Sequence, residues 1–258
     1  MPADPPISID PCPLIDALVE VRFDPAVQPE AVFGILLTKL SHKFPKVVPL
    51  QPAILPEEMR KLNPALFFQP QFRLEGEKFA ALIGPNVFAV AMLGQYPGWK
   101  VLSNEFRQTL RVVHESQVIK TTSRFALHYV NYFDRNILPQ LTLSVTIDAE
   151  PVNGESTVFK TILQGDGYRL QLQVVTDLKV STNNPSLGVD PNVLGSLIDI
   201  DCFIDYPTVG EDFLGSLGSF MESAHAAEKK LFFDLLADEF LKTLNPKYAD
   251  SSSNGQDK

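Results

Sequence analysis

The spacing of apolar residues in the first half of the chain predicts strands and two helices. Apolar and charged side chains alternate toward the end of residues 14–23, as expected for a strand with one buried face. Apolar residues recur every three or four positions at 29–44 and 99–113, which predicts helices, and the proline-rich stretch 46–70 predicts extended or irregular structure. Further strands are predicted where short apolar runs are rich in strand-forming residues or bounded by turn residues, at 71–75, 78–83, 87–93 and 124–133.

The second half begins with more strands. Apolar and polar residues alternate strictly at 141–147 and 168–174, which predicts strands with one face in water. Two further strands are expected at 157–163 and 197–204. The polar segment 181–195 is long enough that we expect it to serve a function or to be mobile rather than to act as a plain connector.

A long helix is predicted near the C-terminus. Thr208 and Glu211 have the spacing of a capping box and precede an apolar stripe at helical spacing. We expect this helix to continue to Leu244, because the following Asn-Pro pair cannot extend it. Gly215 and Gly218 weaken the first turns and are positions at which the helix could divide.

Together these elements predict an α+β fold. We expect a mainly antiparallel sheet, helices packed on one face of it and a long C-terminal helix. Each half carries strands followed by a helix, so the two halves are candidates for a pseudo-repeat. The predicted parts are an N-terminal half over 1–135, an acidic C-terminal half over 136–248 and a disordered tail over 249–258.

The net charge of −9 is concentrated in the second half of the 258-residue chain. Residues 1–130 hold 12 acidic and 13 basic side chains, a balance of +1, whereas residues 131–258 hold 19 acidic and 9 basic ones, a balance of −10. An acidic surface repels nucleic-acid phosphates and attracts basic proteins. We therefore expect no direct DNA binding through the C-terminal half, and a basic protein is the candidate partner.

Several classes of protein are disfavoured by composition and motifs. A hydrophobic content of 45% is sufficient for a core, but the apolar runs are too short to span a bilayer, so no membrane association is expected. The first residues lack the pattern of a secretion signal, which predicts a cytoplasmic location. Cys12 and Cys202 suggest neither a disulfide framework nor a zinc site. Phosphate-loop, dinucleotide, zinc-protease and serine-hydrolase motifs are absent, so no cofactor is predicted.

Three carboxylates share one face of the last predicted strand. Asp199, Asp201 and Asp205 lie on the same side, because side chains alternate along a strand with a period of two. Oxygen ligands of this kind suit Mg²⁺ or Ca²⁺, but a solvated face that docks on a basic protein is the favoured interpretation, and no metal is predicted. Glu211 and Asp212 follow and complete the set of predicted partner-binding residues.

Two residues of the strand at 124–133 are weak catalytic candidates. Arg124 and His128 share one face, and an imidazole can exchange protons near neutral pH. The sequence offers no nucleophile to complete such a site, so a non-catalytic role is favoured and the enzyme question stays open. Trp99 is expected to anchor its helix to the sheet, with stacking on a ligand as the alternative, and a functional role of His225 is a further alternative to a place at the helix rim.

Four segments resemble a sporadically distributed family of prokaryotic proteins. They are Pro-Leu-Ile-Asp-Ala-Leu-Val-Glu-Val-Arg-Phe at 13–23, Tyr-Pro-Gly-Trp at 96–99, Arg-Phe-Ala-Leu-His-Tyr-Val-Asn at 124–131, and Asp-Ile-Asp at 199–201 followed by His225 and Phe240. The resemblance covers nearly the whole chain. It implies no activity, because none is assigned to the family, whose scattered occurrence is similar to that of defence, mobile-element and toxin–antitoxin accessory genes.

The favoured function is therefore a non-catalytic protein-binding factor of the antitoxin, immunity or defence-accessory type. Its acidic C-terminal half would dock on a basic protein. A small-molecule or nucleotide-processing enzyme is the alternative, with a pocket between the sheet and the segment 181–195. A third interpretation is a homodimeric structural subunit that pairs through the long helix.

Overall fold

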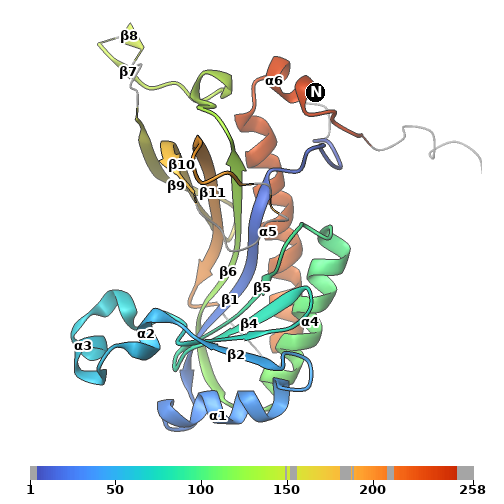
Figure 1. Cartoon of the computed structure of the whole chain (residues 1–258). Coiled ribbons are helices and arrows are strands. Elements are labelled where there is room, and N and C mark those ends of the chain that lie inside the picture. The colour runs from blue at the N-terminus through green and yellow to red at the C-terminus, as the bar shows by residue number, and fades with distance from the viewer. Residues whose placement is uncertain are drawn as a thin grey trace, which may run out of the picture.

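The chain folds around a nine-stranded antiparallel sheet, so the predicted α+β class is confirmed (Figure 1). The computed structural model describes residues 5–148, 150–151, 156–180, 187, 189–207 and 212–248. In spatial order the strands are β2 (Lys46–Pro49), β3 (Phe72–Glu75), β4 (Phe79–Ile83), β5 (Val87–Met92), β1 (Leu14–Pro25), β6 (Ile119–Phe133), β11 (Leu194–Asp205), β10 (Arg169–Lys179) and β9 (Val158–Gln164).

The order of the strands repeats across the middle of the sheet. β3, β4 and β5 form a meander whose last strand pairs with β1, and β9, β10 and β11 form a meander whose last strand pairs with β6. A long helix follows each meander, and β1 and β6 pair with each other where the halves meet. The halves are therefore pseudo-repeats in topology, and one continuous sheet runs through both.

Three helices cover one face of this sheet: α1 (Pro29–Leu40), α4 (Trp99–Glu115) and the 23-residue α5 (Phe213–Leu235). α1 contacts α4, α4 contacts α5, and α5 lies across β6 and β11 (Figure 1). The apolar stripe of α5, which includes Leu217, Met221 and Ala224, is buried in the core of its own chain. Within the described residues, no helix combines the length and the apolar character needed to cross a membrane.

Most of the predicted elements are present with ends close to those expected. The strands at 14–23, 71–75, 78–83, 87–93 and 124–133 correspond to β1, β3, β4, β5 and β6, and those at 157–163, 168–174 and 197–204 correspond to β9, β10 and β11. The proline-rich stretch 46–70 carries one strand and three short helical turns. These turns are α2 (Gln51–Ile54), α3 (Glu57–Leu62) and the 3-10 helix η1 (Pro64–Leu66).

The strand predicted at 141–147 is wrong over most of its length. Only β7 (Thr146–Ile147) is extended in a ladder, and it pairs with β8 (Glu150–Pro151) outside the main sheet. After the 3-10 helix η2 (Leu138–Gln140), Leu141 forms a bridge with Leu236, and the Thr142 amide donates to the Leu235 carbonyl at 2.8 Å. The C-terminal end of α5 thus takes the backbone hydrogen bonds that a neighbouring strand would have made.

The predicted C-terminal helix is also interrupted, but not at its glycines. α5 runs without a break through Gly215 and Gly218 and ends at Leu235, after which Leu236 is extended and α6 (Asp238–Thr243) begins. The helix breaks at Leu236, which forms a β-bridge with Leu141, so this tertiary contact determines where α5 ends. The predicted capping pair Thr208 and Glu211, residues 181–186 and 188 of the polar segment, and the tail 249–258 lie outside the described residues.

Candidate functional site

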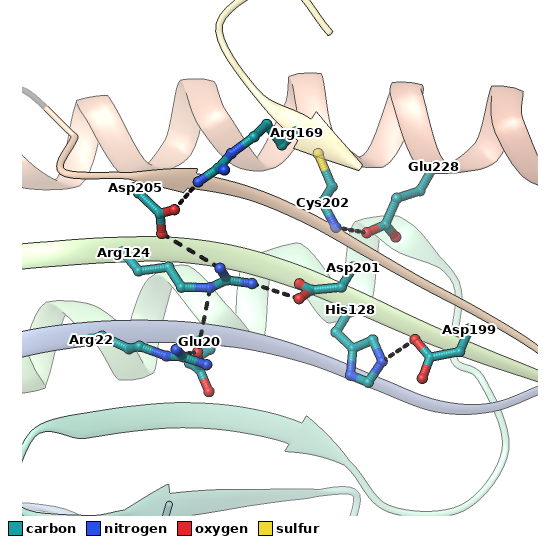
Figure 2. Close-up of polar contacts among 10 residues, drawn as sticks. All are labelled: Glu20, Arg22, Arg124, His128, Arg169, Asp199, Asp201, Cys202, Asp205 and Glu228. Carbon is teal, nitrogen blue, oxygen red and sulfur yellow. Dashed lines mark hydrogen bonds and ion pairs between the residues drawn. The ribbon is translucent and has the colours of Figure 1, made fainter. Parts of the chain in front are cut away.

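Charged residues that the sequence placed on two separate strands come together on the sheet face opposite α4 and α5. β6 and β11 are antiparallel neighbours, and their register sets Arg124 against Asp205 and His128 against Asp201. β1 and β10 add further charges to the same face (Figure 2). We call this set the ionic face, and its members are Glu20, Arg22, Arg124, His128, Arg169, Asp199, Asp201 and Asp205.

Arg124 is the centre of the ionic face. Its side chain is only 12% exposed, and its Nη2 donates to Oδ2 of Asp201 at 2.5 Å, while its Nη1 lies 3.5 Å from Oδ1 of Asp205. The guanidinium also stacks 3.7 Å from the ring centre of Phe203. Asp205 is shared, because Arg169 forms an ion pair with its second oxygen. A cation that is held by two carboxylates and an aromatic ring has a structural role, since removing it would leave the partly buried Asp201 without an ion-pair partner.

His128 and Asp199 form the second pair of the ionic face. Nε2 of His128 lies 2.7 Å from Oδ1 of Asp199. Burial lowers the pKa of His128, but the hydrogen bond to Asp199 and the negative charges of Asp199, Asp201 and Asp16 outweigh burial, so the pKa is raised. The pKa of Asp201 is also raised. In this case burial is the main cause, and the positive charge of Arg124 opposes it.

The predicted partner-binding residues are therefore engaged within the chain. Asp199, Asp201 and Asp205 each have an internal basic partner, and Asp212 is the N-cap of α5, where its Oδ1 accepts a hydrogen bond from the Gly215 amide at 2.8 Å. Glu211 lies outside the described residues. The weak catalytic candidates Arg124 and His128 are the partners of these same acids, so the two predicted sites are one network.

A cavity of about 530 Å³ lies on the opposite side of the sheet, among the helices. It is enclosed by α5, β6, the N-terminal residues 7–14 and the turn at 96–99. Its mostly apolar walls include five aromatic rings, namely those of Tyr96, Trp99, Tyr129, Phe232 and Phe233. Its volume falls within the range of about 300–1,000 Å³ that is typical of small-molecule sites.

Glu228 is the most unusual residue of this cavity. It lies on the buried stripe of α5 and is 1% exposed. Its Oε1 accepts a hydrogen bond from the Cys202 amide at 3.0 Å, whereas its Oε2 is buried with no partner among the described residues (Figure 2). Burial raises the pKa of Glu228 well above its ordinary value, and the acids on the far face of the sheet raise it further.

Tyr129 and His225 form a polar pair beside Glu228. The Tyr129 hydroxyl lies 3.1 Å from Nδ1 of His225, and the imidazole stacks on Trp99 with ring centres 4.1 Å apart. Burial, reinforced by the charge of Lys229, lowers the pKa of His225 to about 4. The imidazole is therefore neutral at pH 7, and its Nδ1 can accept a hydrogen bond from the Tyr129 hydroxyl. At the edge of its ring, Trp99 also donates a hydrogen bond from Nε1 to Oε2 of Glu222 at 2.9 Å.

A second cavity, of about 580 Å³, lies beside α1 and the short helical turns. Its charged lining residues are Glu30 and Arg60. The guanidinium of Arg60 already donates to the carbonyl oxygens of Leu55, at 2.6 Å, and Pro52, at 3.2 Å. This second cavity is therefore a weaker candidate for a ligand-binding site than the cavity around Glu228.

Sequence reasoning placed the alternative pocket elsewhere. The 530 Å³ cavity has in its lining none of the described residues of 181–195. Trp99 was expected to anchor its helix to the sheet, but its ring stacks on His225 of α5 and lines the cavity. Glu228 was missed as a site residue, although a signal was present: it is an acid at a position of α5 where the helical period expects an apolar side chain. Among the described residues, no group of three potential ligands could hold a metal ion.

Comparison with known proteins finds no matching family model, no matching curated protein and no matching solved structure.

Proposed function

We propose that the protein binds a small, largely apolar molecule in the cavity between α5, β6 and the turn at 96–99. One observation carries this proposal: the wholly buried Glu228, whose Oε2 has no partner among the described residues, belongs to the lining of a cavity whose walls are mostly apolar. A buried polar atom without a partner costs about 1–3 kcal/mol. A ligand that supplies the missing hydrogen bond recovers this cost, which accounts for a structure that leaves the oxygen unsatisfied.

The surroundings of Glu228 support a pre-formed site. Trp99 stacks on His225 and donates to Glu222, and His225 contacts Tyr129, so these contacts hold the walls in place before a ligand arrives. Apolar walls with a few polar groups at fixed positions are typical of small-molecule sites. Rigid walls also favour affinity, since little conformational entropy is lost on binding.

Trp99 makes the test specific, because it is the one tryptophan of the chain. Titration with ethylbenzene, an apolar probe of suitable size, is expected to change Trp99 emission saturably. Cys12→Phe places a ring in the cavity lining and is expected to abolish the change. Val101→Phe adds the same ring at an exposed position of α4 and is the matched control. The absence of any saturable response in the unaltered protein would contradict the proposal.

The second candidate function is protein binding through the acidic C-terminal half. The helices leave the ionic face uncovered by any described helix, and the charge balance of residues 131–258 is −10. Association with a basic protein should then weaken at high salt, because exposed charges are screened beyond about 8 Å at physiological ionic strength. Co-purification at low and high salt, with Asp205→Asn as the variant, tests it. Association that is indifferent to salt and to Asp205→Asn would count against this function.

A further inference from the structure

Two ionisable groups in the lining of the 530 Å³ cavity have no partner of opposite charge among the described residues. They are the carboxyl of Glu228 and the ammonium of Lys229, which are consecutive residues of α5. We propose that the ligand is a zwitterion with an apolar body, that is, an amino acid with an aromatic or large aliphatic side chain. This inference rests on the proposed function and names the chemical class of its ligand.

The carboxyl of Glu228 calls for a cationic donor. Oε1 is already used by the Cys202 amide, and Oε2 is the buried atom that remains free among the described residues (Figure 2). A primary ammonium can donate to Oε2 and at the same time contact the faces of Tyr and Trp rings, which attract cations. Tyr96, Trp99 and Tyr129 supply such rings in the same cavity.

The ammonium of Lys229 calls for an anion. Lys229 lines the cavity and forms no ion pair with any described residue, in contrast to Lys230, which pairs with Asp234 on the outer side of α5. Partial burial lowers the pKa of Lys229. A ligand carboxylate would accept a charge-assisted hydrogen bond from this ammonium.

No simpler charge type matches both groups. A neutral ligand leaves Glu228 and Lys229 unpaired, a cation meets the repulsion of Lys229, and an anion meets the repulsion of Glu228 once that carboxyl ionises. Two neighbouring polar contacts are already formed: Tyr129 with His225, and Glu222 with Arg107 and Trp99. A zwitterion pairs with both free groups, and the Phe232 and Phe233 rings can contact its apolar body.

The test compares four ligands that share one benzene ring. These are phenylalanine, phenethylamine without the carboxylate, 3-phenylpropanoate without the ammonium, and ethylbenzene without either. We expect phenylalanine to bind most tightly in isothermal titration calorimetry, with each missing charge weakening binding about tenfold or more, as for other charged hydrogen bonds. Trp99 emission confirms that each ligand enters this cavity.

Two variants assign the two charges. Glu228→Gln keeps an oxygen for the Cys202 amide and should remove the preference for phenylalanine over 3-phenylpropanoate. Lys229→Met keeps the aliphatic stem and should remove the preference for phenylalanine over phenethylamine. Lys230→Met, at the next position and outside the cavity lining, should change none of the four affinities.

The outcomes separate the two proposals. If ethylbenzene binds as tightly as phenylalanine, the ligand class is wrong while the small-molecule function stands. If none of the four binds, both are overturned. Should Glu228→Gln fail to fold, the four-ligand comparison on the unaltered protein and the Lys229→Met variant still decide the matter.

Discussion

The two faces of the central sheet treat their charged groups in opposite ways. On the ionic face, Arg124, His128 and Arg169 are each paired with an aspartate, and the charges largely neutralise one another. On the helix-covered face, Glu228 and Lys229 line a cavity without partners of opposite charge among the described residues. The difference teaches that a dense group of charges can be a structural network, whereas Glu228 is buried beside a cavity without an opposite charge among the described residues.

The contrast arises along the same two strands, one residue apart. Arg124 and His128 of β6 point to the ionic face, and the neighbouring Tyr129 points to the cavity. On β11, Asp201 belongs to the ionic face, and the amide of Cys202 donates to Glu228. Variants on the two faces should therefore differ in kind, with stability lost on one face and affinity altered on the other.

The largest loss of stability is expected for Arg124→Met. The change leaves Asp201 and Asp205 without their shared cation, and we expect the free energy of unfolding to fall by about 2–4 kcal/mol, as when one member of a buried pair is removed. Urea denaturation measures this loss. Arg135→Met is the control, because Arg135 and Asp134 are both 62% exposed and their pair should contribute less than about 0.5 kcal/mol. Equal losses in the two variants would contradict the central role of Arg124.

Glu228→Gln is expected to stabilise the ligand-free protein at alkaline pH. The folded pKa of Glu228 is raised above its ordinary value of 4.5, so its stabilising contribution is present below pH 4.5 and is lost as the pH rises through the folded pKa. Glutamine does not ionise. The variant should therefore gain about 1–3 kcal/mol over the unaltered protein at pH 8 and little at pH 4. A gain that is the same at both pH values would show that ionisation of Glu228 is not its source.

The two histidines should titrate on opposite sides of their ordinary value of 6.5. In an NMR titration, His128 is expected to stay protonated above pH 6.5, and His225 to stay neutral down to about pH 4. The stability from His128 is then lost as the pH rises through its folded pKa, and that from His225 is lost as the pH falls from about 6.5 to 4. His128→Gln and His225→Gln assign the signals, and titration of both near 6.5 would refute the contrast.

The smallest effect is expected for Arg107→Met, which breaks the ion pair between α4 and α5. Arg107 and Glu222 are both about half exposed, so the free energy of unfolding should fall by about 0.2–1 kcal/mol. Thermal denaturation at low and high salt measures it, and the loss should shrink as salt screens the pair. Because Glu222 also accepts from Trp99, a loss well above this range would indicate that the variant disturbs the cavity wall.

Local spacing was enough to predict most of the fold. The alternation in β1 and β10 and the helical periods of α1 and α4 match the structure, because each buries one side of an element against a common core. Alternation failed at 141–147, where the pattern was correct for a strand but no neighbouring strand of the main sheet was available. The pattern of a segment predicts which of its sides is apolar. It does not predict which strand the segment pairs with, because that strand lies elsewhere in the chain.

The candidate sites show the same division. Alternation correctly placed Arg124 with His128, and Asp199 with Asp201 and Asp205, on single faces of their strands. It could not show that these strands are neighbours, and so it treated acids that pair within the chain as free for a partner. His128 and Asp199 are separated by 71 residues in sequence and by 2.7 Å between their polar atoms.

The sequence by itself determined the α+β class, the positions of the main strands and helices, and the face on which each strand residue lies. These properties depend on neighbours within a few positions, which the sequence displays directly. Only the tertiary structure decided which strands pair, which charges neutralise one another and which groups line a cavity. Those properties depend on contacts between segments far apart in the chain, since Glu228 meets Cys202 and Trp99 meets His225 only after the sheet and helices have packed.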